Sequence, residues 1–125
     1  MTPTLIKNYT AGSGGVRQYR IVKIGAADGE VVEASAVGDV MLGVAVQPGT
    51  TAQGGRCDVA LDGIAEVSAG GTITRGAYVT ATTGGQAVAA APAAGVNNGI
   101  VGIALVGAVE DDIIPVLLKQ GRIQG

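Results

Sequence analysis

The sequence contains no histidine, phenylalanine or tryptophan, and it has only one cysteine and three tyrosines. The lack of histidine excludes Ser-His-Asp and Cys-His catalysis and removes the commonest zinc ligand. A single cysteine, Cys57, cannot form an intrachain disulfide or a thiolate zinc site. No histidine or lysine lies near Cys57 to activate its thiol, so we interpret it as a small buried apolar side chain.

Charge is also scarce, because charged residues make up 14% of the chain and the net charge is −2. The basic residues form no cluster and aromatic stacking platforms are nearly absent, which argues against a nucleic-acid partner. No apolar run approaches the roughly 18 residues of a membrane helix, and residues 1–10 lack the apolar core of a signal peptide. We therefore expect a soluble chain made in the cytoplasm, with no membrane partner.

Small side chains take the place of aromatic ones. Alanine and the 22 glycines together make up about a third of the sequence, and the apolar fraction is 47%. Each small side chain buries little area, at ~25 cal/mol per Å². A lone monomer should therefore be only modestly stable, and oligomerisation would add to its stability.

The apolar pattern has a period of two, and glycine pairs or Asp28-Gly29 separate short runs, which is typical of β-strands and hairpins. Pro92 and the flanking glycines leave the alanine-rich stretch near residue 90 too short for a helix. The pattern predicts an all-β fold, a small Gly/Ala/Val-rich barrel or sandwich of the β-tulip kind. The expected strands cover residues 19–24, 30–34, 40–46, 57–62 (continuing through 64–67), 77–81, 86–89, 100–105 and 113–118.

Pro3 and the run Gly12-Ser13-Gly14-Gly15 predict an extended N-terminal arm at 1–18, followed by a single β-domain at 19–125. The arm is either a frayed terminus or a segment that orders on a partner. Residues 20–63 and 76–121 share one order of strands, glycine turns and loops. Either internal structural symmetry or the general likeness of small β-proteins explains this order.

Two other patterns have a chemical and a structural interpretation. The acidic run Glu110-Asp111-Asp112 lacks the spacing of a calcium loop, so we interpret it as a solvated loop tip. Residues 66–79 have a spacing of Val, Gly and Ile that also occurs in biotinyl- and lipoyl-carrier domains. The internal lysine, Lys23, lies in an expected strand rather than at a hairpin tip, which makes a carrier the less favoured alternative.

The second half of the chain carries an ordered series of short motifs over residues 63–118. The motifs are Gly63-Ile64-Ala65-Glu66-Val67, Ala69-Gly70, Ile73-Thr74-Arg75-Gly76-Ala77-Tyr78-Val79, Gly84-Gly85, Val101-Gly102-Ile103-Ala104-Leu105, Gly107-Ala108 and Ile114-Pro115-Val116-Leu117-Leu118. In this order they resemble the pattern of the capsid cement (head-decoration) proteins of tailed bacteriophages. Pro115 departs from the family pattern, which predicts an edge position or a bulge.

The resemblance implies a structural virion protein on the outer capsid surface. Such proteins bind the exterior of the expanded head, usually as trimers, and stabilise it by bridging neighbouring subunits of the major capsid protein. This role needs no catalytic group, cofactor or metal, which agrees with the missing histidine, so we predict that the protein is not an enzyme. The alternative is another β-rich structural or adhesion module of a tail or surface.

If the resemblance holds, the N-terminal arm is the candidate capsid contact, because an extended segment can add a strand to a neighbouring sheet. The candidate contact residues are Leu5, Ile6, Tyr9, Arg17 and Tyr19. Contacts within a homotrimer should come from the apolar strands at 100–105 and 113–118, although the same residues could form the core.

Overall fold

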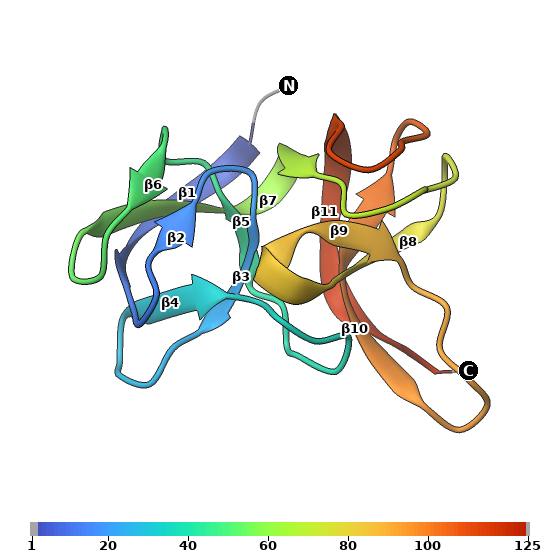
Figure 1. The fold of residues 1–125 in the computed structure, drawn as a ribbon, viewed down its shortest axis with the longest axis horizontal. Helices are drawn as coiled ribbons and strands as arrows, with labels where there is room; N and C mark the ends of the chain where they lie inside the picture. The colour runs from blue at the N-terminus through green and yellow to red at the C-terminus, as the bar shows by residue number, and fades with distance from the viewer. Residues whose placement is uncertain (1–2, 125) are drawn as a thin grey trace.

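The computed structural model describes residues 3–124, which form an all-β structure with one short 3-10 turn, η1 (Thr83–Gly85), as Figure 1 shows. The all-β prediction is confirmed. The strands are β1 (Pro3–Ala11), β2 (Val16–Arg17), β3 (Ile21–Ile24), β4 (Glu30–Glu33), β5 (Gly43–Ala45), β6 (Thr50–Thr51), β7 (Arg56–Ser68), β8 (Tyr78–Ala81), β9 (Ala87–Ala89), β10 (Asn97–Ala104) and β11 (Ile113–Gln124).

Nine of these strands form one sheet in the order β1-β4-β3-β5-β7-β11-β10-β8-β9, and β2 pairs with β6 apart from it. Strands β1, β4, β3, β5 and β7 close into a barrel, because β1 also pairs with β7. Strand β1 runs antiparallel along the first half of β7 and meets β4 in parallel at Thr10 and Ala11. We call this unit, seen at the left of Figure 1, the N-terminal barrel.

The remaining strands repeat the same arrangement. The order β4-β3-β5-β7 of the first half matches the order β9-β8-β10-β11 of the second. The second half of β7 pairs antiparallel with β11, as β1 pairs with the first half of β7. A parallel bridge between Ala69 and Ala87 then corresponds to the β1–β4 contact. We call this second unit, at the right of Figure 1, the C-terminal barrel.

The two barrels also agree in register, so their positions can be matched one to one. A row of three neighbouring residues crosses β3, β5 and β7, and a corresponding row crosses β8, β10 and β11. The rows are Ile21, Val44 and Ala60 in the N-terminal barrel, and Tyr78, Ile103 and Leu117 in the C-terminal barrel. The chain therefore consists of two copies of one small β-fold that share strand β7.

The residues that pack inside each barrel match as well, and all of them are small or β-branched. The N-terminal interior comprises Ala11, Val16, Val22, Val31, Ala45, Cys57 and Val59. The C-terminal interior comprises Ala69, Ile73, Val79, Ala87, Ala104, Ile114 and Val116. Because the barrels are narrow, aromatic side chains are not needed to fill them, which explains their scarcity.

The segment expected as an N-terminal arm at 1–18 is extended, but the structure differs from the expected boundary before residue 19. Strand β1 pairs with β7 from Pro3 to Thr10 and closes the N-terminal barrel, and Ala11 and Val16 are fully buried in its interior. The glycines that suggested a flexible break form a tight turn, in which Gly15 donates a hydrogen bond to the oxygen of Gly12. Met1, Thr2 and Gly125 lie outside the described residues.

Pro115 does not mark an edge strand, because β11 lies between β7 and β10. Its oxygen accepts a hydrogen bond from Leu105, one residue beyond the end of β10. The nitrogen of Pro115 points to the same side of the strand, where β10 has ended and no ladder hydrogen bond is required. The edge prediction is therefore wrong, and proline is tolerated because β10 ends at Ala104, before the position opposite Pro115.

Two glycines permit the close approach of strands in the two barrels. A Cβ at Gly43 would overlap the backbone oxygen of Ala60, and a Cβ at Gly102 would overlap the backbone oxygen of Leu117. These four residues occupy equivalent places in the repeat, so the same packing constraint operates twice.

We predict that Gly43→Ala and Gly102→Ala each lower the free energy of unfolding by about 2 kcal/mol or more, because backbone must move to admit the methyl group. Gly38→Ala is the control, since a Cβ there meets nothing within 4 Å; it should change stability by less than about 0.5 kcal/mol. Urea denaturation measures all three, and an unchanged midpoint for Gly43→Ala would contradict the packing argument.

Candidate functional site

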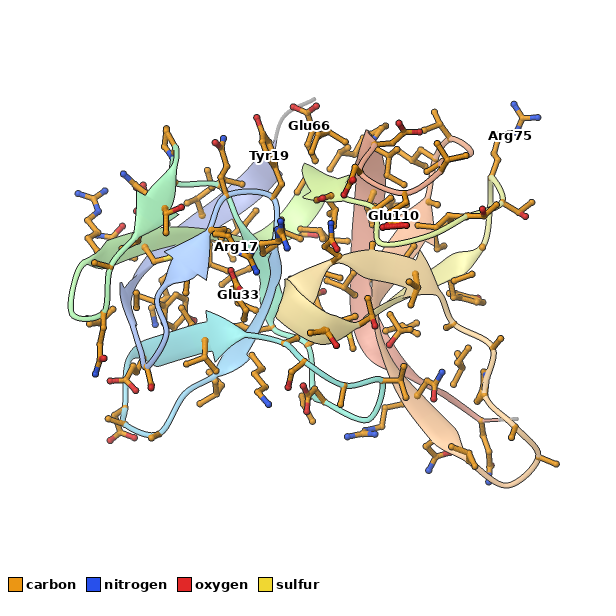
Figure 2. The ribbon with its side chains drawn as sticks, viewed as in Figure 1. Arg17, Tyr19, Glu33, Glu66, Arg75 and Glu110 are labelled. Atoms are coloured by element: carbon orange, nitrogen blue, oxygen red, sulfur yellow. The ribbon has the colours of Figure 1, made fainter. Side chains whose placement is uncertain are left out.

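A hollow of about 370 Å³ lies where the two barrels meet. Strands β1 and β7 and the loop before β3 supply its walls, and the labelled Tyr19 and Glu66 lie close together at this junction in Figure 2. We call it the junction hollow. Its lining residues are Ile6, Gln18, Tyr19, Val46, Asp58, Ile64, Ala65 and Glu66.

Tyr19 holds an unusual backbone conformation in this hollow, with a φ of 68° in the left-handed region. The equivalent residue of the C-terminal barrel is Gly76, whose φ is 85°. Backbone hydrogen bonds fix Tyr19, because its N–H donates to Ala45 and its oxygen accepts from Ser68. A bulky residue in this conformation costs roughly 1 to 2 kcal/mol, and such strain gathers at functional sites.

Strand β1 presents apolar side chains to solvent. Leu5 and Ile6 are 52% and 48% exposed. Tyr9 differs from them, because it is half-buried and packs against the interior of the N-terminal barrel, while the ammonium of Lys7 lies 5.3 Å from its ring centre. Of the three residues on β1 that were expected to contact a partner, Leu5 and Ile6 are exposed to solvent and Tyr9 is half-buried.

Arg17 is engaged within the chain. Its guanidinium donates to both carboxylate oxygens of Glu33 at 2.9 Å, and its backbone N–H donates to the same carboxylate. Figure 2 shows the two side chains pointing toward each other. Burial would raise the pKa of Glu33, but the hydrogen bonds and the charge of Arg17 outweigh it and hold that pKa below its usual value. Arg17 therefore ties β2 to β4.

Of the five candidate contact residues, the structure brings Ile6 and Tyr19 together in the junction hollow. Leu5, Tyr9 and Arg17 are not among its lining residues. The sequence reasoning missed the acidic pair Asp58 and Glu66, which line the hollow from β7. The alternation of Asp58 with the buried Cys57 and Val59 gave a signal that this carboxylate faces outward, but not that it faces the loop of Tyr19.

The residues considered for chemistry take structural roles. Cys57 is fully buried, which confirms its interpretation, and burial raises the pKa of its thiol to about 11. Lys23 lies within β3 and pairs with Asp39 at 3.1 Å, so it does not occupy the hairpin tip of a carrier domain. Asp112 caps its own loop by accepting from Val109.

Within residues 3–124 no group of three His, Cys, Asp or Glu side chains gathers as a metal site would require. Over the same range, no helix has the length and apolar character to cross a membrane.

Comparisons with protein-family models and with curated proteins give no match. Among solved structures, the chain is similar to the N base of head fiber gp8.5 of bacteriophage phi29, with a TM-score of 0.72 and 20% identity. The superposition covers 97% of this chain and 98% of that one. The likeness shows that the two proteins share a fold over nearly their whole lengths.

We predict that Tyr19→Gly is more stable than Tyr19→Ala by about 1 kcal/mol, because only glycine adopts the left-handed conformation without strain. Gly76→Ala should lose a similar amount, since its φ is positive and a Cβ there meets nothing within 4 Å. Thermal or urea unfolding compares the variants. An alanine variant at position 19 as stable as the glycine variant would show that the backbone is relaxed there.

The Arg17–Glu33 pair should make stability depend on pH. Because the pKa of Glu33 is lowered in the folded state, its contribution is present above the unfolded value of about 4.3 and is lost as pH falls through the folded value. Glu33→Gln should cost about 1 kcal/mol at neutral pH and much less at an acid pH below the folded value. Glu110→Gln, at an exposed loop tip, is the control. Equal losses for Glu33→Gln at both pH values would contradict this prediction.

Proposed function

We propose that this chain is a structural protein of a tailed-phage virion that binds the exterior of the expanded capsid. In this role it bridges neighbouring subunits of the major capsid protein and so stabilises the shell. The observation that carries the proposal is the shared fold with a head fiber base over almost the full length of both chains. The order of motifs over residues 63–118, which resembles capsid cement proteins, supports it independently.

The chemistry of the chain agrees with a binding role rather than catalysis. The junction hollow is lined by apolar residues, Gln18, Tyr19 and two carboxylates. The buried thiol of Cys57 has a raised pKa, which opposes nucleophilic activity. We therefore propose that the protein is not an enzyme and acts only through its contacts.

The proposed capsid contact is the exposed surface of β1 together with the junction hollow. Among the described residues, β1 meets β4 only at Thr10 and Ala11, so the strand edge from Leu5 to Tyr9 facing away from β7 has no partner strand. An extended capsid segment could pair with this edge while its side chains contact Ile6 and Tyr19. Asp58 and Glu66 would favour basic residues in that segment.

Self-association would strengthen such attachment. In a homotrimer, one copy's weak contact is repeated three times, and the effective concentration of the second and third contacts makes the whole attachment tight. Bridging several capsid subunits then lowers the free energy of the assembled shell, because this protein would bind only the assembled shell and not the separate subunits.

The test mixes the purified protein with undecorated expanded heads of the phage that encodes it and measures co-sedimentation. We expect saturable binding, and we expect Ile6→Asp to weaken it at least tenfold by placing a charge beside two carboxylates. Val109→Asp is the matched control, because Val109 is 58% exposed and lies outside the junction hollow; it should bind as the unsubstituted protein does.

Two results would count against the proposal. Failure of the unsubstituted protein to bind expanded heads would refute the capsid role, and binding to host cells or glycans instead would favour the tail or surface adhesion module. Undiminished binding of Ile6→Asp would refute the proposed contact surface while leaving the capsid role in place.

A further inference from the structure

The contact between the two barrels of one chain uses one apolar surface from each. The row Ile21, Val44 and Ala60 on the N-terminal barrel is fully buried; we call it the buried row. It belongs to one continuous cluster with residues of the C-terminal barrel. Its members on strands β8, β10 and β11 include Ala81, Val101 and Leu118, which we call the covering surface.

Hydrogen bonds confirm that this contact joins the barrels directly. Gln120 of β11 donates from its amide nitrogen to the backbone oxygens of Leu42 and Leu61, at 2.9 and 2.7 Å. Gly99 of β10 donates to the oxygen of Val37 at 2.7 Å. The contact is asymmetric, because the buried row of one copy meets a different surface of the other copy.

Since the barrels are equivalent, each of these surfaces exists a second time. The counterpart of the buried row is Tyr78, Ile103 and Leu117, which we call the open row. Tyr78 is 46% exposed, and Ile103 and Leu117 are half-buried. No element within residues 3–124 covers this row as the C-terminal barrel covers its counterpart.

The counterpart of the covering surface is also open. Ile24 corresponds to Ala81, because Ile24 pairs with Val31 as Ala81 pairs with Ala87. Leu42, just before Gly43, corresponds to Val101, just before Gly102. Leu61, just after Ala60, corresponds to Leu118, just after Leu117. Ile24, Leu42 and Leu61 line an apolar hollow of about 310 Å³, in which Ile24 is 56% exposed. We call it the apolar hollow. Val40, Met41 and Gln120 complete its lining.

We propose that chains associate head to tail, with the open row of one chain seated in the apolar hollow of the next. The occupant of each surface is thus a second copy, because within the chain the same two kinds of surface already cover each other. Tyr78 would be buried in the hollow as Ile21 is buried in the cluster that it shares with the C-terminal barrel. A head-to-tail contact uses two different patches, so repeating it gives a ring where the rotation between successive chains closes and a filament where it does not. The ring is the form that the homotrimer of the proposed function requires.

This inference rests on the self-association included in the proposed function and specifies its surfaces. Its test uses the free protein, so it can fail while capsid binding stands. The strands at 100–105 and 113–118 were expected to provide either core residues or trimer contacts. In the proposed ring they provide both. Alternate residues point into the barrel, and Ile103 and Leu117 point to the neighbouring chain.

The experiment measures mass by light scattering for the unsubstituted protein, Tyr78→Lys, Ile24→Lys and an equimolar mixture of the two variants. Each substitution places a charge on an exposed position, so the monomer should fold, as circular dichroism checks. We expect the unsubstituted protein to form a closed oligomer, three times the 12.2 kDa chain mass if it is the trimer. Each variant alone should be monomeric, and the mixture should form dimers, because it retains one intact pair of surfaces.

The control is Val109→Lys, an equally exposed apolar position outside both surfaces, which should keep the unsubstituted mass. A monomeric unsubstituted protein, or a mass that rises without limit with concentration, would overturn the closed ring. If Ile24→Lys alone still dimerises, or the mixture stays monomeric, the head-to-tail pairing is wrong. Dimers in the mixture also show that both variants are folded.

Discussion

The continuity of strand β7 through two barrels is the constraint on which the rest of the structure depends. The first half of β7, up to Gly63 with its φ of 86°, pairs with β1 and β5 and closes the N-terminal barrel. The second half pairs with β11 and is the first strand of the C-terminal barrel. A shared strand holds the barrels at a fixed offset, so the outer face of one must be buried against the other. The buried row and the junction hollow both follow from that offset.

Small side chains make this arrangement possible and also limit it. Gly43 and Gly102 allow neighbouring strands to approach until backbone meets backbone, and alanine and valine fill interiors too narrow for aromatic rings. Such cores bury little area per residue. Contacts between barrels, within a chain or between chains, are therefore the means by which a fold of this composition gains stability and function. Tyr19, which lines the junction hollow between the barrels, has a left-handed backbone at a position where the other barrel has Gly76.

Much of the strand pattern could be predicted from the sequence, because alternation and glycine turns are local signals. The hairpin at Asp28-Gly29 and the passage of β7 beyond Gly63 are examples. The role of β1 could not be predicted, because its pairing with β7 joins residues some fifty positions apart and leaves no local trace. For the same reason the sequence suggested Ile6 and Tyr19 as contact residues but not their meeting with Asp58 and Glu66.

By itself the sequence determined the all-β class, the absence of histidine-based chemistry and the order of two similar halves, since these depend on composition and on periodicity along the chain. Only the tertiary structure decided that the halves are barrels sharing a strand, that residues 3–11 complete the first of them, and which equivalent surfaces are covered. The physical reason is that burial is a property of the assembled fold. Ile21 and Tyr78 occupy matching positions, and only their surroundings make one of them core and the other surface.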